Sequence, residues 1–381
     1  MVYYVKQGNL PHTRHTFDDR GVIWREELFG EESFEGSYSL LYHRDEPTRV
    51  KLLREVMKEG FALGNGLLHR LIHTDLLGRE GDFVSGRRVL LSSGPLLISV
   101  SKPRVRMKSL FSHGLRDQLI FVHRGKGKMV SVMGNIEFSQ GDYLYIPKGL
   151  IYRMEYDGSS IFLVIESRDG IHIPERYLNR YGQLKEGVPY YTRDIRPPVL
   201  ARAEEPQGER QTEVMIDLDD RYVVEERDRS PFDLEGWDGY HYPFAISIRD
   251  MMPIVGKIHQ PPPVHESFSS KTFMVATFLP RKFDFHERAI PISYYHNNVD
   301  TDEFLFYSSG NFMSRRGIRE GSITLHVRGL VHGPQPGTVE ESIGRDATDE
   351  TAVMLESYLP LRITRDAEKI EDRSYMRSWY K

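Results

Sequence analysis

The sequence predicts a mostly β protein assembled from two related β-domains, and three observations favour this fold class. Short segments rich in β-branched and aromatic residues recur between the 21 prolines and 32 glycines of the 381-residue chain. Helical periodicity is weak, and a pattern of landmarks repeats in the two halves. We therefore expect strands throughout, among them Leu97–Ser101, Leu119–His123 and Phe162–Glu166.

Helices are expected only at the periphery. Two segments have some helical spacing of apolar residues, TRVKLLREVMK at Thr48–Lys58 and EKIEDRSYMRSWY at 368–380. Both are short and are flanked by Gly or Pro, which break helices. Neither is long enough to form a layer of the fold by itself.

The internal repeat is the most specific feature of the chain. From Gly141 the sequence reads GDYLYIPKGLIY, and from Gly321 it reads GSITLHVRGLVH, with the second glycine at the same offset. Upstream, Gln118 and Glu303 each stand seven residues before a glycine. Any pair of β-hairpins would have glycines at turns, but two sets of matching offsets favour two related β-domains.

A proline-rich segment divides the halves. Residues 195–211 read IRPPVLARAEEPQGERQ, with mixed charges and little apolar periodicity, which is typical of a surface linker. We expect an N-terminal domain at 1–194 that includes an N-terminal extension, a linker at 195–212 and a C-terminal domain at 213–381.

Composition excludes several classes of function. The 51 basic and 55 acidic residues are scattered and give a formal charge of −4, so no nucleic-acid partner is expected. No apolar run approaches the roughly 18 residues that cross a membrane, and the start lacks a secretory signal, so we expect a cytoplasmic protein without membrane contact. With 0 cysteines, any metal must be held by histidine and carboxylate side chains.

Only the second half has ligand-type residues at the decisive positions of the repeat: His296, Glu303 and His332. Two imidazoles and a carboxylate leave coordination positions open, the arrangement by which ferrous iron accepts a chelating substrate and dioxygen. Single buried histidines are more often hydrogen-bonded core residues, but three residues in register favour a metal site. The first half is degenerate at the same offsets, where it has Phe111, Gln118 and Tyr152.

The repeat resembles the cupin superfamily, whose second motif has the form G(X)5PXG(X)2H. The first copy has Pro147 but ends in Tyr152, and the second has Val327 in place of the proline but ends in His332. Most of the chain is also similar to bacterial homogentisate 1,2-dioxygenases, above all in SPFDLEGWDGYHYPF, KIHQPPPVH, FLPRKFDFHERAIPISYYHNNVDTDEF and GSITLHVRGLVHGPQPG. The resemblance implies a bicupin of two jelly-roll barrels, with Fe(II) held by the three ligand-type residues named above. It also implies ring opening of a small aromatic acid by O2, for homogentisate to maleylacetoacetate, and a homo-oligomer, trimer or hexamer.

The resemblance leaves the general base open. The catalytic histidine of the animal enzymes lies in a Trp-His-Gly context, whereas this chain has Asp238 between Trp237 and Gly239. A base should have a pKa near the working pH, which histidine meets most easily. The candidates, of which the last two are favoured, are Asp238, His259, His241 and His265.

Further residues match substrate contacts of the family. His326 could touch substrate or orient a ligand, one of Tyr294 and Tyr295 could line the pocket, and Arg281 could bind a carboxylate in a bidentate pair. Phe312 stands where the family has a substrate-binding tyrosine. Each has a plainer alternative, which is a core histidine, a half-buried ring or a surface ion pair.

Two other functions remain as alternatives. The loss of the family tyrosine and histidine allows a cupin dioxygenase for another hydroxylated aromatic acid, such as a gentisate-like substrate. Because β-barrels of this type carry many unrelated functions, a non-catalytic metal-binding bicupin is the alternative from a different class.

Overall fold

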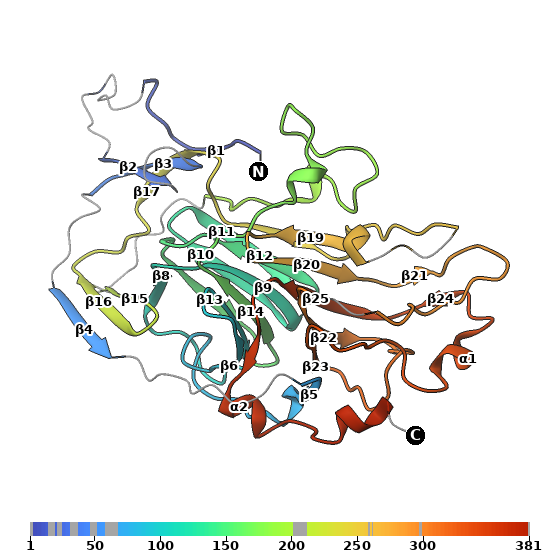
Figure 1. Cartoon of the computed structure of the whole chain (residues 1–381). Coiled ribbons are helices and arrows are strands. Elements are labelled where there is room, and N and C mark those ends of the chain that lie inside the picture. Colours follow the sequence, from blue (N-terminus) through green and yellow to red (C-terminus); the bar gives the residue numbers. More distant parts are fainter. Residues whose placement is uncertain are drawn as a thin grey trace.

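The structure of the chain is a computed structural model, and strands dominate it (Figure 1). It describes residues 3–13, 20, 25–30, 37–45, 52–57, 68–200, 212–257, 260, 262–296 and 299–379. The helices of this part are short: α1 (Thr338–Ser342), α2 (Arg365–Glu368) and the 3-10 turns Thr74–Leu76, Glu175–Tyr177, Thr192–Asp194, Pro262–His265 and Tyr375–Trp379. Among these residues, no helix has the length and apolar character needed to span a membrane.

Two seven-stranded sheets form the first barrel. The outer sheet has the order β11-β10-β13-β8-β15-β16-β4 and comprises β4 (Leu52–Met57), β8 (Leu110–His113), β10 (Lys126–Ser131), β11 (Gly134–Ser139), β13 (Tyr152–Tyr156), β15 (Thr212–Asp217) and β16 (Arg221–Arg227). The central sheet has the order β18-β12-β9-β14-β7-β6-β26 and comprises β6 (Arg87–Ser92), β7 (Leu96–Ser101), β9 (Asp117–Arg124), β12 (Asp142–Ile146), β14 (Ile161–Ser167), β18 (Phe244–Ser247) and β26 (Arg362–Ile363).

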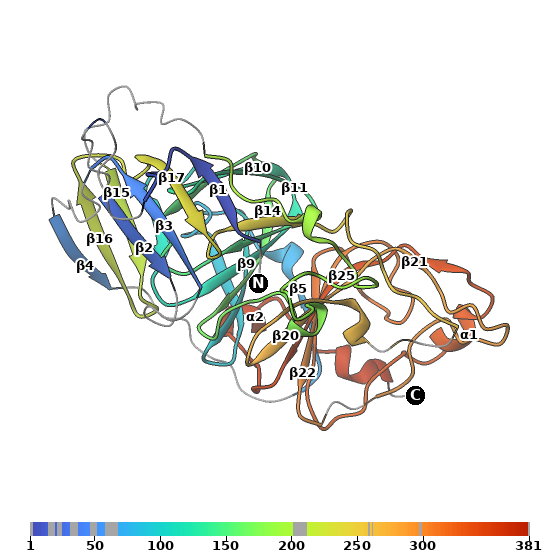
Figure 2. The ribbon, with the colours of Figure 1, turned by 90° about the horizontal axis from the view of Figure 1, so that it is seen from above.

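A six-stranded sheet forms the second barrel, in the order β19-β20-β25-β22-β23-β5. It comprises β5 (Arg70–His73), β19 (Glu266–Ser269), β20 (Phe273–Phe278), β22 (Asp302–Ser309), β23 (Ser322–His326) and β25 (Thr351–Ser357), next to the small pair β21 (Arg281–Lys282) and β24 (Ala347–Thr348). A four-stranded sheet, β1-β17-β3-β2, lies at the opposite end of the molecule in Figure 2; its strands are β1 (Val5–Gly8), β2 (Arg25–Gly30), β3 (Tyr38–His43) and β17 (Leu234–Gly239).

Strand alternation explains how the second barrel is attached to the first. Along β22, Phe304 and Phe306 belong to the main hydrophobic core, and Phe306 lies 6.4 Å, centroid to centroid, from Phe121 of β9. Glu303 and Leu305 point to the other face, because successive side chains of a strand alternate. The central sheet is therefore packed on both faces. One face of the six-stranded sheet packs against it, and the inner face of the second barrel, which carries Glu303 and Leu305, is not covered by the first barrel.

The expected strands are confirmed, since they lie within β7, β9 and β14. The helix expected at Thr48–Lys58 is wrong: Leu52–Met57 form strand β4, which pairs with β16. Pairing across a sheet has overridden a weak helical pattern there. The tail expected as a helix contains only the end of α2 and the 3-10 turn Tyr375–Trp379.

The internal repeat is confirmed in three dimensions. Strand β9 pairs with β12 and β14 in the first barrel as β22 pairs with β23 and β25 in the second. Gln118 and Glu303 occupy the same place in these pairings, opposite Glu166 and Glu356 respectively. The repeat therefore records two copies of one supersecondary unit.

Strand pairing also bears on where the halves divide. Strands β15, β16 and β18, which follow the expected linker at 195–212, join sheets of the first barrel, and residues 201–211 lie outside the described part. This pairing favours a division near residue 247, after β18, rather than at the proline-rich segment.

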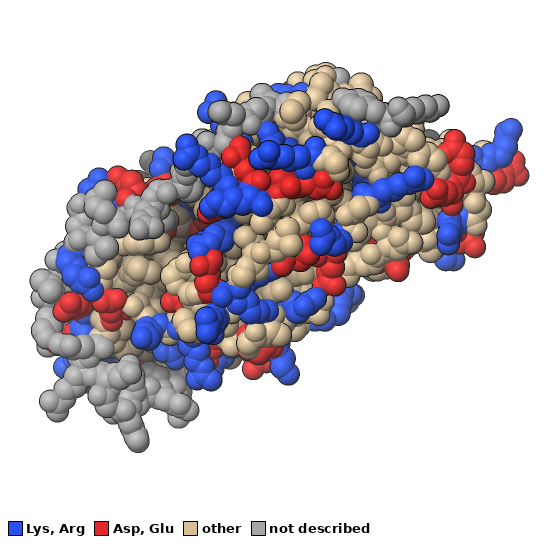
Figure 3. Space-filling model, turned by 90° about the horizontal axis from the view of Figure 1, so that it is seen from below, with Lys and Arg blue, Asp and Glu red and all other residues tan. Residues whose placement is uncertain are grey.

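Basic and acidic side chains are interspersed over the face of the molecule seen in Figure 3.

Candidate active site

A cavity of about 480 Å³ lies on the free inner face of the six-stranded sheet. Its floor is formed by inward-pointing side chains of the sheet, and its walls by the connections around them. Much of the lining is apolar, including Met274, Phe278, Ile292, Leu305 and Met354. The remaining wall is polar and contains the predicted metal ligands His296 and Glu303.

The three residues predicted as ligands converge beside this wall, where His296 and Glu303 line the cavity and His332 is buried next to them. Ligand atoms of His296, Glu303 and His332 all lie within 4.8 Å of one another. Glu303 is the second residue of β22, whereas the two histidines lie in connections and form a reciprocal backbone pair, with N···O distances of 2.8 and 2.9 Å. A break in strand geometry does separate His296 from Glu303, as their odd spacing requires.

Hydrogen bonds fix the tautomer of both histidines. His296 Nδ1 lies 3.2 Å from the carbonyl oxygen of Tyr294, and His332 Nδ1 lies 3.0 Å from that of Leu330. Because a carbonyl only accepts, each Nδ1 carries a hydrogen, and in the neutral form of either ring the lone pair is on Nε2. His332 Nε2 is buried and has no hydrogen-bond partner among the described residues.

The buried negative charge of Glu303 would be stabilised by a cation beside its carboxylate. Burial would raise its pKa, but hydrogen bonds with His296 and His326 hold the pKa well below its ordinary value, so the carboxylate is charged. His296 Nε2 lies 3.3 Å from Glu303 Oε2, and the hydrogen bond with Glu303 raises the pKa of His296. Two lone pairs facing each other across this distance need a proton or a metal ion between them. The donor set, N, N and O, fits a divalent transition metal.

His326 holds Glu303 in place. Its Nδ1 donates to Glu303 Oε1 at 2.6 Å, and its Nε2 accepts from the hydroxyl of Tyr375 at 2.9 Å. The ring is fully buried, and burial lowers its pKa to about 3, so the imidazole is neutral. It does not line the cavity, so of its two predicted roles the geometry favours orienting a ligand.

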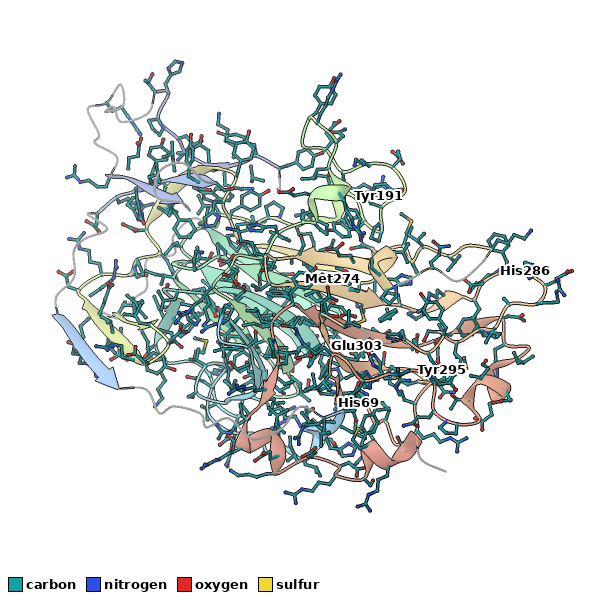
Figure 4. The ribbon with its side chains drawn as sticks, viewed as in Figure 1. His69, Tyr191, Met274, His286, Tyr295 and Glu303 are labelled. Carbon is teal, nitrogen blue, oxygen red and sulfur yellow. The ribbon has the colours of Figure 1, made fainter. Side chains whose placement is uncertain are left out.

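Only some of the residues predicted to contact substrate line the cavity. Phe312 and Arg281 line the cavity, and Arg281 donates to Glu350 at 3.2 Å. Of the tyrosine pair, Tyr294 lines the cavity, whereas Tyr295 is 56% exposed and does not (labelled in Figure 4).

Of the described candidates for the general base, only His265 lines the cavity. His265 is buried, ends the 3-10 turn Pro262–His265 and lines the cavity. Asp238 belongs to β17 of the four-stranded sheet, where Tyr4 donates to it, and His241 packs against Phe29 at 4.9 Å. Neither lines the cavity within this chain. His259 lies outside the described residues.

Sequence reasoning missed Glu356 and Arg315, which also line the cavity. Glu356 is 8% exposed and accepts from Thr301; burial and the negative charge of Glu303 raise its pKa to about 7. Glu166 holds the matching place opposite Gln118 in the first barrel, but this correspondence appears only in the strand pairing, because the spacings along the sequence differ. No spacing rule pointed to Arg315.

The first barrel has no comparable arrangement at the matching place. Tyr152 donates to Gln118 at 2.6 Å, Gln118 donates to Glu166 at 2.8 Å, and Glu166 pairs with Arg87. These polar atoms satisfy one another, which suits a structural role. A second cluster, His113 with Asp217 and Asp219, has ligand spacing, but Arg116 and Arg168 neutralise Asp219 and hold its pKa at about 2.

Fold and site together define a two-barrel protein with a candidate metal centre in its second barrel. Two family models match the chain, "Homogentisate 1,2-dioxygenase N-terminal" over residues 87–248 and "Homogentisate 1,2-dioxygenase C-terminal" over residues 247–381. The chain therefore belongs to the homogentisate 1,2-dioxygenase family, which supports a ring-cleaving dioxygenase. The two-part match and the strand pairing confirm the predicted fold class, mostly β with two cupin-type barrels.

Individual relatives agree with this membership. A provisionally named dioxygenase of Saccharolobus solfataricus is 43% identical over 386 residues and 100% of both chains. A homogentisate 1,2-dioxygenase of Rhodopseudomonas palustris is 24% identical over 76% of this chain and 67% of its own length, and that of Nitrobacter hamburgensis is 25% identical over 66% and 58%. The matched part thus spans 58–67% of these two longer enzymes. Among solved structures, a cupin barrel protein of Leptotrichia buccalis aligns with 81% of this chain and 99% of its own at 9% identity and a TM-score of 0.34.

Proposed function

We propose that this protein is an Fe(II)-dependent dioxygenase that opens the ring of homogentisate, with His296, Glu303 and His332 as metal ligands. The observation that carries the proposal is the convergence of two Nε2 atoms and a buried carboxylate, of which His296 and Glu303 line the cavity and His332 is buried beside them. Two imidazoles and one carboxylate are typical of non-haem ferrous oxygenases. The names of the family and of its members support the substrate.

Iron would supply the redox chemistry that couples an aromatic diol to dioxygen, for which amino-acid side chains are unsuited. The side chains of this protein bind and orient the reactants. His265, buried in the wall, is the proposed base that removes a proton from a ring hydroxyl. Both atoms of O2 enter the product, which for homogentisate is maleylacetoacetate.

One observation favours a second candidate substrate. Phe312 forms part of the cavity wall where the family has a tyrosine, so a hydrogen bond to substrate is replaced by an apolar contact. Sites built around a hydroxyl contact discriminate strongly between substrates with and without the partner group. The second candidate is another hydroxylated aromatic acid of the gentisate type.

Oxygen uptake distinguishes the candidates. Protein stripped of metal is loaded anaerobically with Fe(II), mixed with homogentisate or gentisate, and followed by an oxygen electrode and by absorbance of the ring-opened product. Equimolar uptake with homogentisate is the expected result. Uptake only with gentisate would replace homogentisate as the proposed substrate and leave the proposed metal site unchanged. No uptake with any hydroxylated aromatic acid would favour the non-catalytic metal-binding alternative.

A matched pair of variants tests the site itself. Glu303→Gln keeps the shape of the side chain but removes the charge that offsets the cation, so we expect uptake to fall to background and iron retention to weaken about 100-fold or more. The control is Glu320→Gln, since Glu320 is 48% exposed and pairs with Arg124 at the surface. Wild-type uptake by Glu303→Gln would contradict the assignment.

A further inference from the structure

His69 reaches the candidate metal centre from a part of the sequence remote from the ligands. It directly precedes β5, the edge strand that pairs with β23, where Arg70 lies opposite Leu325. Its side chain is 4% exposed, and Figure 4 shows it on the β5 side of Glu303. Both family matches begin after it, at residues 87 and 247.

The ring of His69 contacts both ends of the turn that joins His326 to His332. The backbone N–H of Val327, the first residue of the turn, donates to His69 Nδ1 at 3.1 Å. Since Nδ1 accepts, the neutral ring carries its hydrogen on Nε2. One side chain thus binds the start of the turn and, through the ring packing described next, also contacts the histidine at its end.

Ring packing adds to these hydrogen bonds. The centroid of the His69 ring lies 5.3 Å from that of His326 and 5.3 Å from that of His332, with interplanar angles of 87° and 76°. The opposite side of the turn faces solvent, since Leu330 and Val331 are 37% and 66% exposed. The turn is also held at Arg328, whose backbone N–H and Nε donate to Asp302 at 2.8 and 2.9 Å, whereas His69 packs against the two histidine rings that flank the turn.

We infer that His69 is a positioning residue, which holds the turn at residues 327–331 so that His332 Nε2 faces Glu303. The inference rests on the proposed function, because it takes His332 to be a metal ligand. Side chains that orient the metal ligands without touching the metal influence the affinity of the site for the metal. Their loss commonly weakens metal binding by about 10- to 100-fold. Here that group is supplied by a segment that precedes both family matches.

Cobalt binding tests the inference without turnover. Metal-free full-length protein is titrated anaerobically with Co(II), and the visible absorption bands report both affinity and ligand geometry. In His69→Phe, which keeps a ring but loses the hydrogen bond with Val327, we expect the dissociation constant to rise about 10- to 100-fold and the bands to change. In His69→Asn, whose amide oxygen can accept from Val327, we expect most of the affinity to return.

The matched control is His73→Phe. His73 ends β5, the strand that His69 precedes, is 6% exposed, and its Nδ1 lies 3.3 Å from Ser322 Oγ rather than against the turn. Its affinity for Co(II) should equal that of the wild type, and thermal unfolding of each metal-free variant checks the fold. Unchanged affinity and bands in His69→Phe, an equal loss in His73→Phe, or no recovery in His69→Asn would each overturn the inference. Absence of Co(II) binding by the wild type would overturn the proposed site as well, which distinguishes the two failures.

Discussion

Three histidines surround Glu303, and their hydrogen-bond partners give them different chemical roles. Carbonyl oxygens hold a hydrogen on Nδ1 of His296 and His332, so Nε2 of each is available to a metal. His326 also has its hydrogen on Nδ1, but in this ring Nδ1 is the nitrogen that faces Glu303. His326 therefore donates a hydrogen bond to the carboxylate. The partner of each ring, rather than the residue type, therefore separates ligand from support.

A charged histidine far from the cavity predicts how stability depends on pH. Burial would lower the pKa of His43, but hydrogen bonds with Asp233 and Glu27, at 2.9 and 2.8 Å, raise it from 6.5 to about 9. A histidine with a raised pKa stabilises the fold while protonated. Its contribution should be complete below about pH 6.5 and lost as the pH rises through about 9.

Asp233→Asn tests this dependence by chemical denaturation. We expect the free energy of unfolding to fall by about 2 kcal/mol at pH 6, and the difference from wild type to shrink toward pH 10. Asp220→Asn, which removes an exposed partner of Arg221, serves as the control and should leave the profile unchanged. A difference from wild type that grows with pH would contradict the assigned sign.

Sequence alone located the predicted ligands but not their surroundings. His296, Glu303 and His332 stand at offsets of a repeat, and the structure brings them together. Glu356 and His69 have no such offset relation to them, because they come from a neighbouring strand and from an edge strand that only the fold brings near. His241 was favoured from its nearness to a family motif, but β17, which precedes it, belongs to the four-stranded sheet.

At the level of elements, the repeat depends on glycines with left-handed backbone. Gly310, which follows β22, has φ of +94°, and Gly125, which follows β9, has φ of +93°. A Cβ at Gly310 would stand 2.3 Å from the carbonyl oxygen of Asp349, closer than any side chain tolerates. The turn thus needs glycine both for its backbone angle and for a close approach.

Two glycine variants separate these requirements. Gly344 has φ of +85° and open space around it, so Gly344→Ala should cost about 1 kcal/mol from backbone strain alone. Gly310→Ala adds a collision with backbone and should cost about 3 kcal/mol or more. Equilibrium denaturation measures both, and equal costs would show that the approach of Asp349 is unimportant.

Elements were predicted well where a strand is central and poorly at the edges. Strands β7 and β14 are buried along their whole length and β9 as far as His123, so their continuous β-branched and aromatic content identified them. Strand β4 lies at the end of its sheet and contains Leu, Arg, Glu and Met, which favour helices. Its conformation depends on pairing with β16, a contact more than 150 residues away in the sequence.

At the scale of the molecule, the two barrels exchange edge strands. Strand β5 from the first part of the chain completes the six-stranded sheet, and β26 from the last part extends the central sheet. One hydrophobic core cluster includes residues of both barrels, among them Phe121, Phe162, Phe273 and Phe304. The division between the two family models near residue 247 is therefore not a division between independent folding units.

Fragments should show this dependence. We expect residues 1–247 and 248–381, produced separately, to lack cooperative thermal unfolding, because each exposes the core face that the other covers. The whole chain should unfold in one calorimetric transition, and mixing the two fragments during refolding should restore it. A cooperative transition in fragment 248–381 alone would contradict the prediction.

The reciprocal backbone bonds between His296 and His332 set the distance between the two proposed nitrogen donors. The centroids of the two rings lie 4.3 Å apart, and both rings project from paired peptide groups. Glu303 lies on β22 and is anchored separately, by its hydrogen bond with His326. We therefore expect the span between the two nitrogens to change less than the contact with the carboxylate when ions of different radius bind.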